Sequence, residues 1–517
     1  AQAGPPWRPL GAFTLDSAYQ ESLLASRASR SEMTGPFGLG AEPGAKAAGS
    51  ESETSEARLQ PRVALDLACR IRSVLLLVAL GTLSAAVVGP SLQFIVTSFF
   101  AEDGGDCELH PKSEPCRRGA AELALYHGVS NGLSHGVAWI AAMVLGSWSD
   151  AMGRRPFMRA KAVFSTVPAA ALCLHVFSGA SLWLYLVLTP MLFAFDNVAV
   201  FFACVNDLVT EPHLRSSTFG IMMGFFILVG GVVMPLGGLL PQRAAVAAYF
   251  AVTLLQVAYM FTCFPETLPK SVAKKAPPGL RSIMRQSMEV FNRNSFIFRM
   301  VFVLVLSAFS CAGLTTLMPS YSMAYLGLNR KLMTMVVFSI GISIALSLSL
   351  FLPLLVQHLG EVGAMKVSLA FMVLYPLLLP LCSNFVHFTI LAALLVGPCV
   401  MCFPVISSIK SNLVGEDEQG IVQGALAAVR VLAVAISDPL FGWLYRLATD
   451  NGARASRFAA LPPILLVAAL SIAAFLVAWG LPHNPPAPKA RKAAEDSAQE
   501  DTVEDTVELT SVTSSTE

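Results

Sequence analysis

The sequence predicts an all-α integral membrane protein, with about twelve transmembrane helices in two six-helix pseudo-repeat bundles. Hydrophobic residues make up 55% of the 517 residues and charged residues only 13%, whereas soluble proteins carry about 25% charged residues. Apolar stretches of about 20 residues, long enough to cross a bilayer, recur along the middle of the chain. They fall into two sets of six around a polar gap of about thirty residues.

The apolar stretches define the expected spans. The first set is 73–99, 122–147, 162–179, 182–206, 218–240 and 244–264. The second set is 297–323, 332–356, 363–382, 385–408, 420–444 and 459–481. The third span is short and the tenth contains Pro398 and Pro404, so a count that differs by one stays open.

Composition divides the chain into five parts. We expect a disordered cytoplasmic N-terminal segment, a six-helix bundle, a cytoplasmic central loop, a second six-helix bundle and a disordered acidic cytoplasmic tail. In that order, their ranges are 1–68, 69–264, 265–296, 297–482 and 483–517.

The loops differ in positive charge, which predicts the orientation of the chain. Arg154, Arg155 and Lys270 are among the many cations in the loops that twelve spans would place on one side, and the opposite loops hold fewer. The last of these opposite loops is an exception because it holds three arginines. Excess Lys and Arg stay in the cytoplasm, so we expect both termini there. The plasma membrane and an organelle membrane both stay open.

The same composition argues against several classes of function. The formal net charge is +1 and no basic stripe with interleaved aromatic residues is present, so we expect no nucleic-acid partner. The sequence contains no phosphate-binding G-x-x-x-x-G-K-(S/T) loop, no spaced His/Glu pair of a metalloprotease and no nucleophile elbow. We therefore expect neither an enzyme nor a bound cofactor.

Two pairs of cysteines stand out among the ten. Cys107 and Cys116 lie in a polar loop; a disulfide is expected there if the loop faces an oxidising compartment, and two free thiols are the alternative. Cys399 and Cys402 have a spacing known from metal and redox sites, but they lie in an apolar span between two prolines. Buried thiols of that kind behave as small hydrophobic groups, so we predict no metal site.

A short loop between the second and third spans combines an acid, a turn and paired cations. It runs from Gly146 through Asp150 to Gly153, Arg154 and Arg155. Asp150 ends the second span, where a cation or a helix N-terminus would stabilise it. Gly153 permits a tight turn, and the two arginines can bridge to acids or phosphates. A signal that only holds arginine in the cytoplasm is the alternative interpretation.

This loop resembles the signature of the major facilitator superfamily, G-x-x-x-D-(R/K)-x-G-R-(R/K). One position departs from it, since Ala151 stands where the family has a cation. The resemblance extends over roughly 70–480 and implies that the loop latches two halves together when the carrier faces outward. Three further stretches match the family in order. They are Pro265–Pro269, which resembles its P-E-(S/T)-L-P exit signal, and two that resemble tetracycline-exporter-like members: Asp207 with Arg215 and Phe219-Gly220, and Gly424–Arg430 with Asp438–Gly442.

The fifth span carries a cluster of small residues around a proline. It contains Gly230, Gly231, Pro235, Gly237 and Gly238. Small residues let helices approach closely, and the proline bends the span. The cluster is similar to the G-x-x-x-G-P-x-x-G-G motif of proton-linked antiporters, although one glycine is replaced and the spacing after the proline is one residue short. Tight packing is the favoured interpretation, and antiport is a second one.

Ionisable residues inside the spans are candidates for the transport site. Asp196, beside Asn197, lies near the middle of the fourth span, and Arg430 near the middle of the eleventh. The carboxylate could carry a proton, while the arginine binds an anion or pairs with Asp196. A buried structural ion pair is the alternative.

The second span adds a polar face made of His127, Asn131 and His135, which recur every fourth residue. Histidine suits proton coupling, yet a membrane histidine also bonds to a neighbouring helix without further function. Asn131 and His135 join the candidate site. Asp438 is as readily explained by bonds to nearby backbone or water.

Together these features predict a secondary active transporter that moves a small solute by alternating access. Proton-coupled efflux by antiport is the first interpretation. Proton-coupled symport or facilitated uptake of an anionic metabolite is the alternative, and a transporter-like receptor or scaffold without transport is an alternative of another class. The expected partners are a small-molecule substrate, protons and the lipid bilayer, and we expect a monomer.

Overall fold

The structure is a computed structural model that describes most of the chain. The described residues are 61–101, 106–192, 198–209, 212–268, 295–413, 416–449 and 457–482. All of them belong to one compact unit, Leu59–Glu517. The expected disordered segment 1–68 and the expected tail 483–517 therefore lie outside the described residues, apart from 61–68.

Regular backbone in the described part of the chain is entirely helical, as predicted. The first group of helices is α2 (Pro61–Arg70), α3 (Arg72–Phe100), α4 (Glu114–Met152), α5 (Arg155–Ser178), α6 (Trp183–Leu192), α7 (Val198–Leu208), α8 (Pro212–Leu239) and α9 (Gln242–Thr262). The second group is α11 (Ser295–Tyr321), η2 (Ser322–Leu326), α12 (Arg330–Leu346), η3 (Ser347–Phe351), α13 (Leu352–Leu378), η4 (Leu379–Leu381), α14 (Phe385–Val400), α15 (Cys402–Leu413), α16 (Glu416–Thr449), η5 (Arg457–Ala460) and α17 (Leu461–Trp479). We call the two groups the first-half and second-half helices. Between them lie residues 269–294, which hold most of the expected central loop and are not described.

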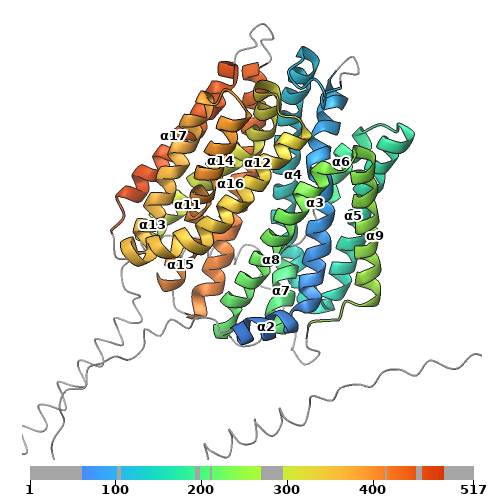
Figure 1. The fold of residues 1–517 in the computed structure, drawn as a ribbon. Coiled ribbons are helices and arrows are strands. Elements are labelled where there is room, and N and C mark those ends of the chain that lie inside the picture. Colours follow the sequence, from blue (N-terminus) through green and yellow to red (C-terminus); the bar gives the residue numbers. More distant parts are fainter. Residues whose placement is uncertain are drawn as a thin grey trace, which may run out of the picture. The chain divides into compact units, whose positions relative to one another are not determined.

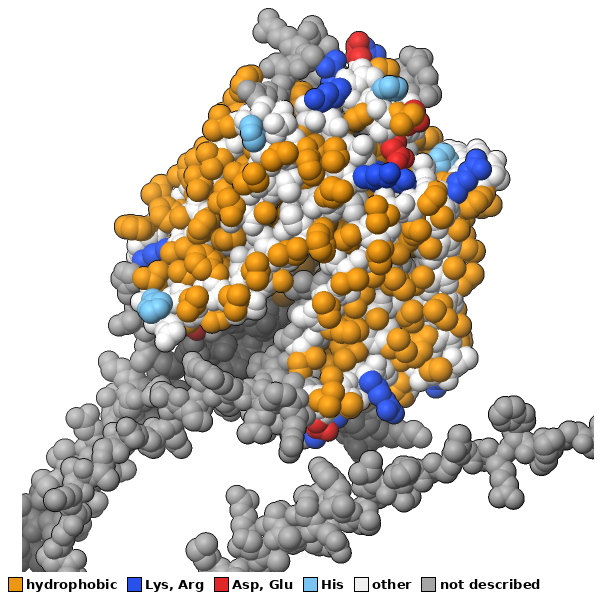
Figure 2. Space-filling view, viewed as in Figure 1, with side chains coloured by type: hydrophobic (Ala, Val, Ile, Leu, Met, Phe, Trp, Pro, Cys, Tyr) orange, Lys and Arg blue, Asp and Glu red, His pale blue; other side chains and the backbone are white. Residues whose placement is uncertain are grey.

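Many of these helices are suited to a bilayer. Eight segments among the described residues are long and apolar enough to cross a membrane. Every span expected from the sequence overlaps described helix, although 193–197 in the middle of the fourth span lie outside the described residues. The count of twelve stays a prediction with which these helices agree. Figure 2 shows hydrophobic side chains covering the middle of the visible face, with Lys, Arg, Asp and Glu gathered toward its two ends.

One of the eight segments contains two expected spans. Arg330–Leu381 runs for 52 residues through α12, η3, α13 and η4. Gly360 breaks it, since its backbone has φ 70° and ψ 174°. L-residues with side chains rarely adopt a positive φ, so glycine separates the two spans here.

The expected disordered segment 1–68 is wrong at its end, because α2 already begins at Pro61. Proline favours the first helical turn. Leu67 at the centre of α2 is fully buried and packs with Ile71 and Val209, so burial of an apolar face stabilises this short helix. Asp66 and Arg70 form an ion pair along it, at 2.9 Å.

Helices of the two halves pack directly against each other. The most extensive contact joins α4 with α16, and further contacts join α8 with α12 and α11 with α4. Within the first half α3 packs on α8 and α9, and within the second half α12 packs on α14 (Figure 1). Of the candidate transport-site residues, Asn131 and His135 lie on α4 and Arg430 lies on α16.

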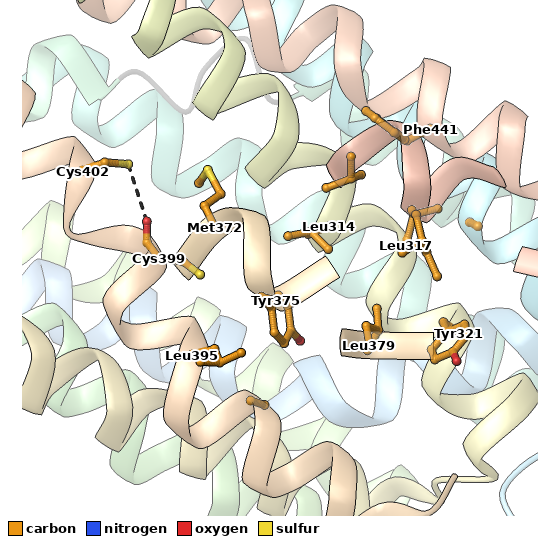
Figure 3. Close-up of a cluster of buried hydrophobic side chains, with 14 of the residues drawn as sticks. Leu314, Leu317, Tyr321, Met372, Tyr375, Leu379, Leu395, Cys399, Cys402 and Phe441 are labelled. Carbon is orange, nitrogen blue, oxygen red and sulfur yellow. Dashed lines mark hydrogen bonds between the residues drawn. The ribbon is translucent and has the colours of Figure 1, made fainter. Parts of the chain in front are cut away.

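The main buried cluster belongs largely to the second half. Figure 3 shows part of it, with Leu317, Met372, Tyr375 and Phe441 among the labelled side chains, all of them buried. Aromatic and aliphatic side chains from α11, α13 and α16 interdigitate there. Since lipid tails are as apolar as these side chains, close packing rather than exclusion from water holds such helices together.

Candidate functional site

A buried carboxylate links three helices from both halves. Asp438 on α16 is only 2% exposed. Thr316 on α11 donates a hydrogen bond to its Oδ1 atom at 2.8 Å, and the Asn131 amide on α4 also contacts this carboxylate. Among the described residues, no Lys, Arg or His side chain forms an ion pair with Asp438. Hydrogen bonds from neutral groups therefore hold the carboxyl group in place.

The backbone around Asp438 approaches α4 closely because glycines face the contact. A Cβ atom on Gly128 or Gly132 of α4 would collide with Asp438 or Pro439 of α16. Gly442 on α16 in turn faces the backbone of α4 at Ala124. Small residues on both helices thus bring Asn131 within reach of Asp438.

Arg430 lies two turns from Asp438 along α16. Its guanidinium carbon stands 4.4 Å from the ring centre of Phe403 on α15. The His135 ring of α4 and the Cys311 thiol of α11 lie near this positive charge. The residue is nevertheless exposed. The arginine is therefore a positive charge held among four helices with part of its surface open.

The candidate residues predicted from the sequence are only partly brought together. Asn131 and His135 lie on the side of α4 that faces α16. The His127 ring contacts the Asn131 amide at 3.3 Å. Asp196 and Asn197 lie outside the described residues, so their predicted pairing with Arg430 stays a prediction.

The small residues of the fifth expected span lie on α8, and three of its glycines face other helices. Gly237 faces the backbone of Val87 on α3, and Gly238 faces the Thr334 side chain on α12. Gly230 lies near Thr82 on α3, whereas Gly231 has open space around it. Pro235 lies inside the helix, as expected. The glycine positions therefore permit contact between α8 of the first half and α12 of the second.

The predicted gating loop lies at the turn from α4 to α5 and is held by charged groups. Gly153 has φ 95° there. The Nε atom of Arg154 lies 3.0 Å from Asp207 Oδ2 of α7, with the Arg154 side chain 7% exposed. The backbone amides of Arg154 and Arg155 donate to the Glu266 carboxylate, at 2.8 and 3.1 Å.

Three stretches of sequence thus meet in one place, which we call the α4–α5 cluster: Ser149, Arg154, Asp207, Glu266 and Thr267. Ser149 accepts a hydrogen bond from Arg154 at 2.6 Å, and Thr267 donates to Asp207 at 3.3 Å. Ser149 and Asp207 lie on first-half helices, Arg154 lies between two of them, and Glu266 and Thr267 follow α9 closely. The predicted latch between the halves stays a prediction. Gly146 and Asp150 lie on α4, but their surroundings are outside the described part.

The opposite end of the fold, where α3 ends and α4 begins, carries ion pairs between the halves. Arg330 at the start of α12 pairs with Glu108, at 3.1 Å, and donates to Ser91 Oγ of α3 at 3.2 Å. Arg446 of α16 pairs with Glu122 of α4, at 2.8 Å.

Glu108 lies in a segment closed by a disulfide. Cys107 and Cys116 are bonded, with their Cα atoms 5.4 Å apart. Both sulfur-bearing residues are buried against Ala101. Cys399 and Cys402 are not bonded; the Cys402 thiol donates to the Cys399 carbonyl oxygen at 3.5 Å (Figure 3). No group of three His, Cys, Asp or Glu residues suited to a metal ion occurs in the described part of the chain.

Sequence reasoning missed the burial of Asp438 between three helices and did not single out Thr316, Glu108 or Arg330. An acid inside an apolar span is a signal in itself. The position of Asp438 near the end of its span concealed the fact that α4 and α11 cover it.

Comparison with known proteins settles the family. The family model described as Major Facilitator Superfamily matches residues 128–438, more than half of the chain. The chain belongs to the major facilitator superfamily. As a member of this superfamily it is a multi-pass membrane transporter and not an enzyme.

Relatives of this facilitator are distant. The hippocampus abundant transcript-like protein 1 of Rattus norvegicus is 23% identical over 381 residues, which are 69% of this chain and 73% of the relative. The crystal structure of the human organic anion transporter MFSD10 (TETRAN) superposes with a TM-score of 0.55 at 20% identity, covering 79% of this chain and 99% of the other. A crystal structure of a mutant of the nucleoside transporter NupG superposes with a TM-score of 0.57 at 14% identity, covering 79% of this chain and 99% of the other. These structural likenesses support the predicted fold.

Proposed function

We propose that this facilitator is a secondary active transporter of a small organic anion, coupled to protons and working by alternating access. In this proposal 69–264 and 297–482 act as the two six-helix bundles, and they rock about a site between α4, α11, α15 and α16. The observation that carries the proposal is the exposed Arg430, held among side chains of both halves.

Arg430 supports an anionic substrate for an energetic reason. A charge in the middle of a span is unfavourable unless it serves a function or has a partner. Phe403 stacks on one face of the guanidinium at 4.4 Å, which leaves its N–H groups available at the edge. Such groups bind carboxylates and phosphates in a planar, bidentate geometry. The likeness to a structure described as a human organic anion transporter agrees with this substrate class.

Asp438 supports coupling to protons. A buried carboxylate without a cation is unfavourable, whereas a carboxyl group that carries a proton is not. Charged or titratable groups near it are His127 and His135 of α4, Cys311 of α11 and Arg430 of its own helix. Opening the contact between α4 and α16 would expose Asp438 to water and let it exchange a proton. Asp196 and Asn197 remain proposed as further groups of the site.

The direction we propose is efflux by antiport. The glycine and proline cluster of α8 and the stretch from Gly424 to Gly442 both resemble proton-linked exporters. The predicted positive-inside orientation puts the α4–α5 cluster at the inner end of the fold and the disulfide-closed segment at the outer end. Symport of an anionic metabolite is the second candidate, since Arg430 suits it equally.

The test is solute flux in proteoliposomes. Purified protein is reconstituted and offered a panel of radiolabelled monocarboxylates, dicarboxylates and organic phosphates, with and without an imposed pH gradient. Arg430→Met should raise the substrate concentration at half-saturation by about tenfold to a hundredfold, because a hydrogen bond to a charged group contributes about 1.5–3 kcal/mol. The matched control is Arg446→Met on the same helix, which should leave half-saturation near the original value.

Two readouts decide the remaining points. Asp438→Asn should leave flux down a solute gradient but remove its dependence on the pH gradient, and an unchanged pH dependence would exclude Asp438 as the coupling group. The sign of the gradient that drives accumulation separates antiport from symport. Specific binding of an anion without flux under any gradient would instead indicate a receptor or scaffold.

A further inference from the structure

The segment 106–116, which we call the outer strap, joins α3 to α4 and is tied into a fixed shape. The Cys107–Cys116 disulfide closes it. Inside the loop the Asp106 carboxylate accepts hydrogen bonds from the backbone amides of Glu108 and Leu109, at 3.0 and 3.2 Å. Both cysteines are 1% exposed. The strap therefore presents Glu108 from a rigid turn.

The strap reaches from the first half to the second. Glu108 pairs with Arg330 of α12 at 3.1 Å. The aliphatic chain of Lys112 lies against Gly327, the residue that ends η2 with φ 72°. A Cβ atom at Gly327 would collide with Lys112. Two separate side chains of the strap thus hold the turn between η2 and α12.

Arg330 is the fixed partner of this contact. Its side chain is 8% exposed, while that of Glu108 is 32% exposed. Ser91 of α3 holds a second guanidinium nitrogen, at 3.2 Å. Two residues further along α12, Leu332 donates its amide to the Asn329 cap at 3.0 Å. Both of these guanidinium bonds therefore run to the first half, and Glu108 is the more exposed partner, which can take up water when the pair separates.

We propose that the outer strap is a gate that holds the outer entrance shut through the Glu108–Arg330 pair, and that this pair must break in every transport cycle. The inference rests on the proposed alternating access. An outward-open state requires the start of α12 to move away from α3, and the strap spans that gap. The disulfide contributes by fixing the shape of the outer strap, so that Glu108 stays within reach of Arg330.

The experiment measures opening without any solute, so it can fail independently of the proposed function. Hydrogen–deuterium exchange is followed by mass spectrometry on the full chain in lipid nanodiscs, in peptides covering 322–334. Glu108→Gln should speed exchange there by about tenfold, as expected when a charge-assisted contact that limits local opening is lost. The matched control is Glu114→Gln, because the ion pair of Glu114 in the described structure runs along its own helix, to Arg118 at 2.7 Å.

A charge exchange guards against a general loss of structure. The double variant Glu108→Arg with Arg330→Glu should restore exchange to within about twofold of the original protein, because it keeps opposite charges at two contacting positions whose changes are not additive. Exchange in Glu108→Gln equal to that of the original protein would overturn the gate. Equal acceleration in Glu114→Gln would overturn it as well, because the effect would then not depend on the contact between halves.

The role of the disulfide is tested by removing both thiols. In Cys107→Ser with Cys116→Ser exchange should also rise, and adding Glu108→Gln should increase it by less than about twofold further, since both changes would release the same contact. If the exchange rates of the two changes multiply in the combined variant, the disulfide does not act through Glu108. If no solute is transported but exchange at 322–334 responds to these variants as expected, the proposed function is wrong and the proposed gate still holds.

Discussion

Arg154 and Arg330 are buried to a similar extent at opposite ends of the fold, but one pairs within its own half and the other pairs across the two halves. The Arg154 side chain is 7% exposed and pairs with Asp207 of its own half, while that of Arg330 is 8% exposed and pairs with Glu108 of the other half. Equal burial makes the loss of water equally unfavourable for both. The first pair stiffens one half, and the second joins surfaces that alternating access would separate.

Arg154 and Arg330 also differ in how completely their guanidinium groups are hydrogen-bonded. Arg154 has Ser149 and Asp207 at its side chain and Glu266 at its backbone amide. Arg330 has Glu108 and Ser91, and its Nε atom is buried without a hydrogen bond. A fully bonded pair is suited to permanent contact. A pair with one unsatisfied donor and a partly exposed partner is closer in energy to its separated state.

The largest effect is expected at the α4–α5 cluster. Arg154→Met would leave Asp207 without its cation and should destabilise the protein by about 3–5 kcal/mol, as when one member of a buried pair is removed. Thermal unfolding in detergent measures this. Arg155→Met is the control, since within the described residues the Arg155 guanidinium bonds to no more than the Phe261 carbonyl oxygen, at 3.4 Å. Equal melting temperatures for the two variants would remove the distinction between the arginines.

An intermediate effect is expected where α8 meets α12. Gly238→Ala would drive a methyl group into Thr334, and overpacking of this kind costs about 1–3 kcal/mol. Gly231→Ala on the same helix is the matched control, because nothing lies within 4 Å of its added methyl group. Melting curves of both variants give the comparison. A loss of stability in Gly231→Ala as large as in Gly238→Ala would point to helix propensity or lipid contact instead of contact between halves.

The smallest effect is expected at the other ion pair between halves. The side chains of Arg446 and Glu122 are 43% and 33% exposed, and exposed pairs contribute about 0–1 kcal/mol. Arg446→Gln should therefore change the melting temperature little and leave exchange at 322–334 unaltered. A double-mutant cycle with Glu122→Gln measures the coupling energy. A coupling as large as that of Glu108 with Arg330 would mean that burial does not distinguish the two pairs.

Much of the fold could be predicted from the sequence because its signals are local. Apolar runs of about twenty residues coincide with helices, and the Gly153 turn and the small residues of α8 lie where the pattern indicated. The helix α2 escaped prediction since its stability comes from Leu67 packing on residues distant in sequence. Propensity cannot reveal such a contact.

The candidate site was less predictable because it depends on contacts between distant segments. His127, Asn131 and His135 share a face by periodicity alone. Nothing in the sequence indicates that Asn131 meets Asp438, or that Phe403 stacks on Arg430. The closeness of Asp207, Glu266 and Arg154 could be anticipated only as a family likeness, since 53 residues separate Arg154 from Asp207.

The glycine at 360 has a consequence for how the chain enters the membrane. Within the 52 residues of Arg330–Leu381, the polar side chains around the break are Gln357, His358, Glu361 and Lys366, and together with Gly360 they separate one apolar stretch from the next. During insertion this stretch would be received as a single hydrophobic hairpin whose two arms enter together. A β-branched residue at 360 would oppose the reversal at its tip, so the arms would compete for one crossing and every later loop would face the wrong side.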